Sequence, residues 1–357
     1  MTTDARLLPP EGRAPDSSAV LSVRDLHVSF PTDDGMVKAV DGVSYDVFEN
    51  EVLGIVGESG SGKSVSSLAI LGLLPKSAHI TGEILYRGQD LLAMREKEKL
   101  RLRGSRLAMV FQDALAALNP VFTVGSQIAE AIEIHNPDMS DKDVRQRTID
   151  LLDLVGIPNP SARVDSYPHE FSGGMRQRTM IAMAISNDPD VLIADEPTTA
   201  LDVTIQAQVL EVIERVQDRT NSAIVLITHD LGVVAGVADR VMVMYAGRPA
   251  EIGTVDEIFY ETRHPYTLGL MAALPRLDEN ADGMRLHRIK GQPPSLIFVP
   301  PGCPFHPRCE FARLPEPCAT AIPEFRGMER PGHKAACHFA EELADKNPDD
   351  LRPVVGS

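Results

Sequence analysis

The segment GESGSGKS, from Gly57 to Ser64, restricts the possible folds of this chain more than any other stretch. It follows the apolar run VLGIV and precedes SVSSLAILGLL, whose apolar pattern predicts a helix. Its glycines allow backbone N–H groups to curl around a phosphate, and the N-terminus of the following helix adds a partial positive charge. A Gly/Ser-rich turn is the simpler alternative. The strand before the segment and the helix after it favour a phosphate-binding loop.

Further short apolar runs share the character of VLGIV, being rich in Val, Ile and Leu and ending at a polar residue. They are RLAMVFQ, VLIADE and AIVLITH. Runs of this kind are typical of strands that are buried on both faces of a parallel sheet, and helical patterns such as VTIQAQVLEVIERVQDR lie between them. The sequence therefore predicts an α/β fold with a doubly wound, mostly parallel sheet. The earlier stretch VLSVRDLHVSF predicts one more strand, whose alternation has one slip that a β-bulge would explain.

Residues further along the chain would complete the nucleotide site together with the phosphate-binding loop. Lys63 is placed to reach the β- and γ-phosphates of a nucleotide, and Ser64 to offer a hydroxyl to Mg²⁺. VLIADE delivers Asp195 to the edge of the sheet, where it can hold the Mg²⁺ shell, and Glu196 follows as a candidate general base. An Asp-Glu pair after a strand is by itself more often a solvated turn, but the loop makes the metal role the better interpretation.

Composition excludes several classes of protein. A net charge of −16 over 357 residues argues against a nucleic-acid partner. No run approaches the roughly 18 apolar residues of a membrane span, and the first residues lack the pattern of a signal peptide, so we expect a cytosolic chain with reduced thiols. We expect a flexible leader over 1–18 and a flexible tail over 341–357.

At this point the chain resembles the ATPases of ABC transporters. FSGGMRQR resembles their signature motif, Gln112 their Q-loop, TALD (Thr199 to Asp202) their D-loop, and His229 their switch histidine. Phe30 matches the aromatic position that stacks on adenine. The signature departs from the commonest form at Phe171 and Met175 but keeps Ser-Gly-Gly. The resemblance implies a P-loop ABC ATPase core over 19–255, which combines the mostly parallel sheet with an antiparallel β subdomain and a helical subdomain at about 113–180.

The resemblance also implies a set of site residues. ATP and Mg²⁺ would be bound within one chain by Phe30, Gly57, Ser59, Gly60, Ser61, Gly62, Lys63, Ser64, Val65, Gln112, Asp195 and His229, with Glu196, His229 and Gln112 catalytic. Ser-Gly-Gly opening a helix is a second anion-binding N-terminus, too far along the chain to serve the same nucleotide. In a head-to-tail dimer, Ser172, Gly173, Gly174 and Gln177 would therefore contact the ATP of the partner, and Asp202 would link the two sites.

The segment LNP after Gln112, together with HPYTLGLMAALP, GQPPSL and GCPFHPRC, resembles the D-type ATPase subunit of dipeptide and oligopeptide importers, with a C-terminal extension over 256–340. This resemblance implies a paralogous ATPase as partner in a heterodimer, two membrane permeases, an extracytoplasmic peptide-binding protein, and a peripheral place on the cytoplasmic face of the inner membrane. An importer of nickel or another solute, and a soluble ABC protein outside transport, are the alternatives.

All four cysteines of the chain, Cys303, Cys309, Cys318 and Cys337, fall in the extension with the spacing C-x5-C-x8-C-x18-C. Four thiolates suit tetrahedral zinc or a [4Fe–4S] cluster, and the wide spacing fits the cluster better. The family resemblance also implies a [4Fe–4S] cluster, which would serve as a structural staple. Zinc, and reduced thiols or a disulfide, remain the alternatives.

Overall fold

The structure is a computed structural model that describes residues 18–199, 201–274 and 288–351. Its centre is an eight-stranded sheet in the order β11-β12-β10-β9-β3-β8-β7-β6, in which β9, β3, β8, β7 and β6 run parallel. The strands are β3 (Val52–Val56), β6 (Leu107–Val110), β7 (Val191–Asp195), β8 (Ala223–Thr228), β9 (Arg240–Tyr245), β10 (Arg248–Thr254), β11 (Arg326–Gly327) and β12 (Lys334–Ala335). The parallel sheet predicted from the apolar runs is confirmed.

Both faces of this sheet are covered, which explains why its strands are apolar throughout. Alternate residues of β3 point to opposite sides: Val52 and Val56 pack into one hydrophobic cluster, Leu53 and Ile55 into the other. The first cluster contains residues of helices α4, α5, α7 and α8, and the second contains residues of α1 and of a second sheet. These helices are α1 (Lys63–Ile70), α4 (Val124–Glu133), α5 (Asp141–Leu154), α7 (Gly173–Ala184) and α8 (Val203–Thr220).

The second sheet is antiparallel, in the order β2-β1-β4-β5, and confirms the antiparallel subdomain. Its strands are β1 (Ala19–Thr32), β2 (Gly35–Phe48), β4 (His79–Tyr86) and β5 (Gln89–Asp90). The register between β1 and β2 shifts between Val23 and Leu26, where Asp25 has a φ of 43°. This irregularity is the slip seen in the sequence, and it lets both apolar residues stay buried.

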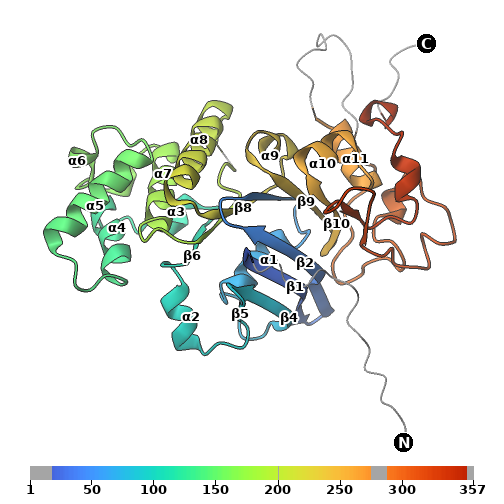
Figure 1. The fold of residues 1–357 in the computed structure, drawn as a ribbon, viewed down its shortest axis with the longest axis horizontal. Helices are drawn as coiled ribbons and strands as arrows, with labels where there is room; N and C mark the ends of the chain where they lie inside the picture. Colours follow the sequence, from blue (N-terminus) through green and yellow to red (C-terminus); the bar gives the residue numbers. More distant parts are fainter. Residues whose placement is uncertain (1–17, 200, 275–287, 352–357) are drawn as a thin grey trace, which may run out of the picture.

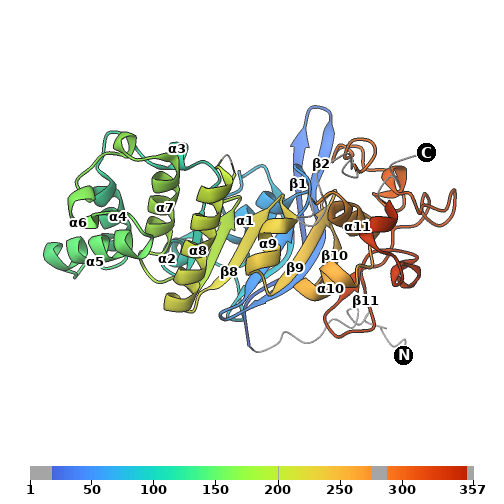
Figure 2. The same cartoon turned by 90° about the horizontal axis from the view of Figure 1, so that it is seen from above.

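The residues between β6 and β7 are helical and contain no strand from 111 to 190, a range that the structure describes throughout. Besides α4, α5 and α7 they form α3 (Ala114–Ala117) and α6 (Pro160–Arg163). The side chains of Thr123, Ser140 and Ser172 accept hydrogen bonds from backbone N–H groups in the first turns of α4, α5 and α7. Figures 1 and 2 show these helices at one end of the molecule, with the two sheets in the middle.

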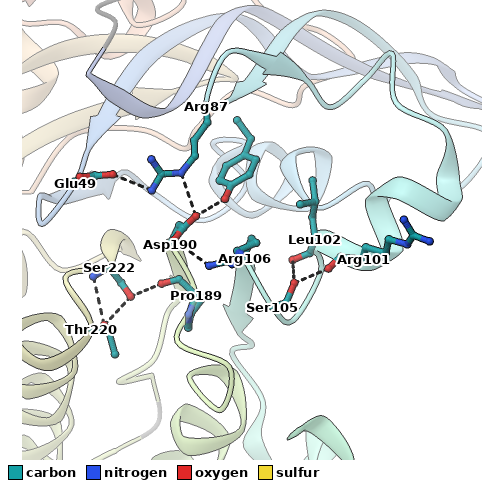
Figure 3. Close-up of polar contacts among 11 residues, drawn as sticks. Glu49, Arg87, Arg101, Leu102, Ser105, Arg106, Pro189, Asp190, Thr220 and Ser222 are labelled. Carbon is teal, nitrogen blue, oxygen red and sulfur yellow. Dashed lines mark hydrogen bonds and ion pairs between the residues drawn. The ribbon is translucent and has the colours of Figure 1, made fainter. Parts of the chain in front are cut away.

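Asp190, immediately before β7, joins the two sheets through its carboxylate (Figure 3). Tyr86 at the end of β4 donates its hydroxyl to this carboxylate, and Arg87 Nε lies 3.2 Å from Oδ2. Arg106 approaches the other oxygen at 3.7 Å, while Arg87 also pairs with Glu49 at 2.8 Å. One partly buried acidic group therefore ties the antiparallel sheet to the strand that carries Asp195.

The remaining helices are α2 (Glu96–Leu102), α9 (Leu231–Val237), α10 (Val255–Tyr260) and α11 (Pro265–Ala272). From 288 the chain runs mostly without regular structure at the opposite end of the molecule, beside β10 (Figure 2). It nevertheless joins the core, because β12 pairs with β10 and His333 Nε2 lies 2.9 Å from the buried carboxylate of Glu251.

Among the described residues, no helix has the length and apolar character needed to cross a membrane.

Candidate functional site

The phosphate-binding loop lies between β3 and α1, as the sequence predicts. Gly62 has a φ of 97°, and a Cβ there would lie 2.2 Å from the backbone oxygen of Ala39, so only glycine fits. Ser61 and Lys63 are buried, while Ser59 and Gly60 are exposed. Lys63 Nζ donates to the backbone oxygens of Gly57 at 2.7 Å and Glu58 at 3.0 Å, which holds the ammonium group within the loop.

The surroundings of Lys63 have two opposite effects on the pKa of its amine. Burial lowers the pKa of the Lys63 amine, and the carboxylates of Glu196, Asp195 and Glu58 oppose that shift. The three carboxylates favour the charged form of the amine, and the ammonium group is the form that can pair with phosphate.

Ser64 and Asp195 meet although they lie 131 positions apart. The hydroxyl of Ser64, in the first turn of α1, donates to Asp195 Oδ1 at 2.9 Å, at the end of β7. Asp195 is only 7% exposed, and burial raises the pKa of its carboxyl, an effect that the Ser64 hydrogen bond opposes. A hydroxyl and a carboxylate side by side are hard oxygen donors of the kind that Mg²⁺ prefers.

Three further side chains lie close to the carboxylate of Glu196. Its Oε2 accepts hydrogen bonds from Gln112 Nε2 at 3.0 Å and from Thr199 Oγ1 at 2.7 Å, and His229 Nδ1 lies 3.4 Å away. Glu196 also has a φ of 48°, a left-handed conformation that costs a residue with a side chain about 1 kcal/mol or more. The ends of β6, β7 and β8 thus bring Gln112, Glu196 and His229 together, beside the Ser64–Asp195 pair.

Other predicted residues lie apart from this cluster. Phe30 is half-buried in β1, opposite Val37 of β2, and packs with Val65 against the second hydrophobic cluster. Ser172 and Gly173 are exposed at the start of α7. Gly174 is buried, and a Cβ there would lie 2.6 Å from Ile205 Cγ2 of α8, so this glycine allows the two helices to approach closely.

Gln177 is buried in α7, only 4% exposed, and does not share the exposure of Ser172. Asp202 is exposed and caps α8, since its Oδ1 accepts a hydrogen bond from Ile205 N at 3.0 Å. Its structural role within this chain is therefore to begin a helix.

The cysteines require a correction. All four line one apolar pocket, together with aromatic, aliphatic and histidine side chains; its lining is His264, Pro265, Cys303, Phe305, His306, Cys309, Phe311, Cys318, Cys337, His338, Phe339 and Leu343. Within the described ranges, no group of three or more Cys, His, Asp or Glu residues is arranged to hold a metal ion. The predicted [4Fe–4S] cluster is therefore wrong for the described residues.

The pocket that the four cysteines share is apolar. Burial raises the pKa of Cys309 and of Cys337 to about 12, so both side chains are protonated thiols at neutral pH in this structure. All four cysteines are free thiols in the structure. The sequence spacing placed the cysteines in one region, where they line the same pocket, but it carried no information on the apolar surroundings of the thiols.

Sequence reasoning missed the contact between the loop and the extension. Glu58, the second residue of GESGSGKS, pairs with Arg308 of GCPFHPRC and donates its backbone N–H to Tyr266. Glu58 occupies a variable position of the loop pattern, and Arg308 stands among the cysteines that drew attention to that segment. Only the fold brings them together.

Comparison with known proteins agrees with this geometry. Residues 40–199 match the family model for the ABC transporter, and residues 250–318 match that for the C-terminal region of the oligopeptide/dipeptide transporter. A structure of cbiO1 from Clostridium perfringens, described as part of the ABC transporter complex cbiONQ, superposes with a TM-score of 0.59 at 29% identity, over 68% of this chain and 92% of that one.

Two relatives extend the match beyond the cassette. The dipeptide transport ATP-binding protein DppD of Bacillus subtilis is 57% identical over 292 residues, which cover 81% of this chain and 86% of that protein. The oligopeptide transport ATP-binding protein OppD of Mycobacterium tuberculosis is 50% identical over 337 residues, 94% of this chain but 54% of that protein, so the chain spans about half the length of this relative. The chain therefore belongs to the ABC transporter family, among the members that carry the oligopeptide/dipeptide transporter C-terminal region.

Proposed function

We propose that this protein hydrolyses Mg-ATP to power an ABC importer of dipeptides or oligopeptides. The observation that carries the proposal is the convergence of Lys63, Ser64 and Asp195 with Glu196 and its partners at one edge of the parallel sheet. These side chains come from four separate segments of the sequence, and each supplies a group that phosphoryl transfer needs.

The residues would divide the work as follows. The loop N–H groups and Lys63 bind the phosphates of ATP, with the adenine beside Phe30. Glu196 accepts a proton from the attacking water, because its carboxylate stands at the end of β7 next to the phosphate-binding loop. Gln112 and Thr199 orient that carboxylate through their hydrogen bonds, and His229 is placed to contact the γ-phosphate.

Ser64 and Asp195 fit Mg²⁺, since the pair offers two hard oxygen donors within 2.9 Å of each other. When bound, Mg²⁺ neutralises charge that develops on the phosphates. The buried ammonium of Lys63 adds a second positive charge to the same region.

The remaining features support an importer in particular. The relatives named for dipeptide or oligopeptide transport match both the cassette and the C-terminal region. We assign the cassette to about 19–255, with the helical subdomain at about 113–180, and the extension to 256–340. The exposed Ser172 and Gly173 support a head-to-tail dimer with a paralogous ATPase, in which each signature covers the other chain's ATP. Two permeases and an extracytoplasmic peptide-binding protein complete the complex, with this subunit peripheral on the cytoplasmic face of the inner membrane.

The experiment is to assay ATP hydrolysis and ATP binding by the purified chain with its paralogous partner. We expect Glu196→Gln to retain ATP and lower turnover by about a hundredfold or more, as loss of a general base does. Glu214→Gln, on the exposed side of α8, is the matched control and should turn over normally. Normal turnover in Glu196→Gln would remove Glu196 as the base. Cells that lack the gene but still import dipeptides and oligopeptides at the parental rate would contradict the transport role.

A further inference from the structure

The C-terminal extension holds one residue of the phosphate-binding loop directly. Arg308 donates to both carboxylate oxygens of Glu58, from Nη1 to Oε2 at 2.5 Å and from Nη2 to Oε1 at 2.9 Å. The two residues lie 250 positions apart. The side chain of Arg308 is only 5% exposed, so water screens this paired geometry little.

Arg308 is itself fixed by two other groups. Its Nε donates to the backbone oxygen of Lys290 at 2.9 Å, and Nη1 lies 3.3 Å from the hydroxyl of Tyr245 in β9. The guanidinium carbon also lies 5.7 Å from the centre of the Tyr245 ring. A planar guanidinium that is held at each nitrogen has one orientation available, and that orientation faces Glu58.

Glu58 has a second attachment on the same side. Its backbone N–H donates to the hydroxyl of Tyr266 in α11 at 2.9 Å. The Tyr266 ring packs against Tyr245 and against Phe305 of the extension, with ring centres 4.7 and 5.4 Å apart. The aromatic cluster therefore makes the Arg308 and Tyr266 contacts parts of one packed unit.

The other side of Glu58 faces the nucleotide site. Its backbone oxygen accepts a hydrogen bond from Lys63 Nζ at 3.0 Å, beside the 2.7 Å bond from Lys63 to Gly57. One residue thus links the extension, through its carboxylate and N–H, to the lysine that the loop presents to phosphate. A displacement of Glu58 would move the carbonyl that holds Lys63.

The extension also reaches the hairpin that carries Phe30. The backbone N–H of Lys38 in β2 donates to the oxygen of Leu296 at 3.4 Å, and a Cβ on Gly35 would lie 3.7 Å from Ile297. The extension therefore contacts the phosphate-binding loop and the adenine-side hairpin, two separate walls of the proposed nucleotide site.

We propose that Arg308 is a positioning residue for this site: through Glu58 it sets the conformation of the phosphate-binding loop, so that docking of the extension and binding of nucleotide stabilise each other. The proposal rests on the proposed ATPase function for its nucleotide readout. It gives the C-terminal region a role in the ATP chemistry, in addition to its place beside β10.

The test compares Arg308→Gln, Arg308→Lys, Glu58→Gln and the double variant Glu58→Gln/Arg308→Gln in the full chain. Arg326→Gln is the matched control, because Arg326 lies in the same extension and pairs at the surface with Glu341, just after it. Retained circular dichroism and thermal midpoint establish that each variant is folded. The readouts are the KM for ATP, kcat, and hydrogen exchange of the peptides that cover 57–64 without nucleotide.

We expect Arg308→Gln to raise the KM about tenfold, with a smaller effect on kcat, as expected for weakened binding. Arg308→Lys should recover part of the loss, since it keeps the charge but not the two-pronged geometry. The double variant should be no worse than Arg308→Gln, because both changes break the same contact. Exchange over 57–64 should be about fivefold faster in Arg308→Gln and unchanged in Arg326→Gln.

A folded Arg308→Gln with the wild-type KM and wild-type exchange over 57–64 would overturn the proposal, as would equal effects in Arg326→Gln. A wild-type chain that binds no ATP would overturn the proposed function instead. The exchange comparison would then still decide whether Arg308 holds the loop.

Discussion

Gln112 Nε2 donates a hydrogen bond to Glu196 Oε2 at 3.0 Å, although the two residues lie 84 positions apart. The contact exists because β6 and β7 are parallel neighbours, with Val110 opposite Ala194, so the residues after each strand emerge at the same edge of the sheet. Gln112 is exposed where it leaves β6, and Glu196 is partly buried. The side-chain amide of Gln112 therefore contacts the carboxylate of Glu196 on its solvent-exposed side.

Gln112→Ala should lower kcat by about tenfold or more while changing the KM for ATP little, because a general base that is free to turn is misplaced for part of the time. Steady-state ATP hydrolysis checks this result. Gln146→Ala is the control, since Gln146 lies on the surface of α5 and donates a hydrogen bond to Asp150 of the same helix at 2.9 Å. A kcat within about twofold of the wild type would show that Glu196 does not depend on Gln112.

Much of the site could be predicted from the sequence because local chemistry determines it. The turn at Gly62 needs a glycine, and each buried strand ends at a polar residue that must lie at the sheet edge. The order of the strands is not local, and neither are contacts such as Glu58 with Arg308. The prediction of a [4Fe–4S] cluster was wrong for the described residues, although the four cysteines do line one pocket, because spacing along the chain does not set the surroundings of a side chain.

Asp190→Asn should destabilise the protein by about 1–3 kcal/mol, the usual cost of leaving partly buried partners without their charged acceptor. Burial, and then the hydrogen bond to Asp190, raises the pKa of Tyr86 to about 12, so Tyr86 remains a hydrogen-bond donor at neutral pH. Arg87 and Arg106 would lose the same acceptor (Figure 3). Denaturant unfolding measures the difference in the free energy of unfolding.

Asp165→Asn supplies the control for this experiment. Asp165 also pairs with an arginine, Arg145, at 2.7 Å, but both side chains are more than half exposed, at 65% and 53%. The unfolding midpoint of this variant should stay near that of the wild type. Equal losses in the two variants would mean that the Asp190 contacts contribute no more than a surface pair.

Cys309 and Cys337 should react slowly with iodoacetamide in the folded protein at pH 8. Burial raises the pKa of both thiols from 9.0 to about 12, and only the thiolate is alkylated, so labelling should be on the order of a thousandfold slower than in denaturant. Mass spectrometry of the modified peptides measures each cysteine separately. Labelling at equal rates in the folded and unfolded chain would contradict the burial of these thiols.

The same shift predicts a dependence of stability on pH. The folded-state pKa of Cys309 lies above the unfolded value of 9.0, at about 12, so the unfolded chain loses this proton first as the pH rises. The contribution to stability is therefore complete below about pH 9 and is lost between about pH 9 and 12. Denaturant unfolding at pH 7 and pH 10 should show a decline that is smaller in Cys309→Ala, because that variant has no thiol to ionise. An equal decline in both proteins would assign the pH dependence to other groups, such as Tyr266, whose pKa burial also raises.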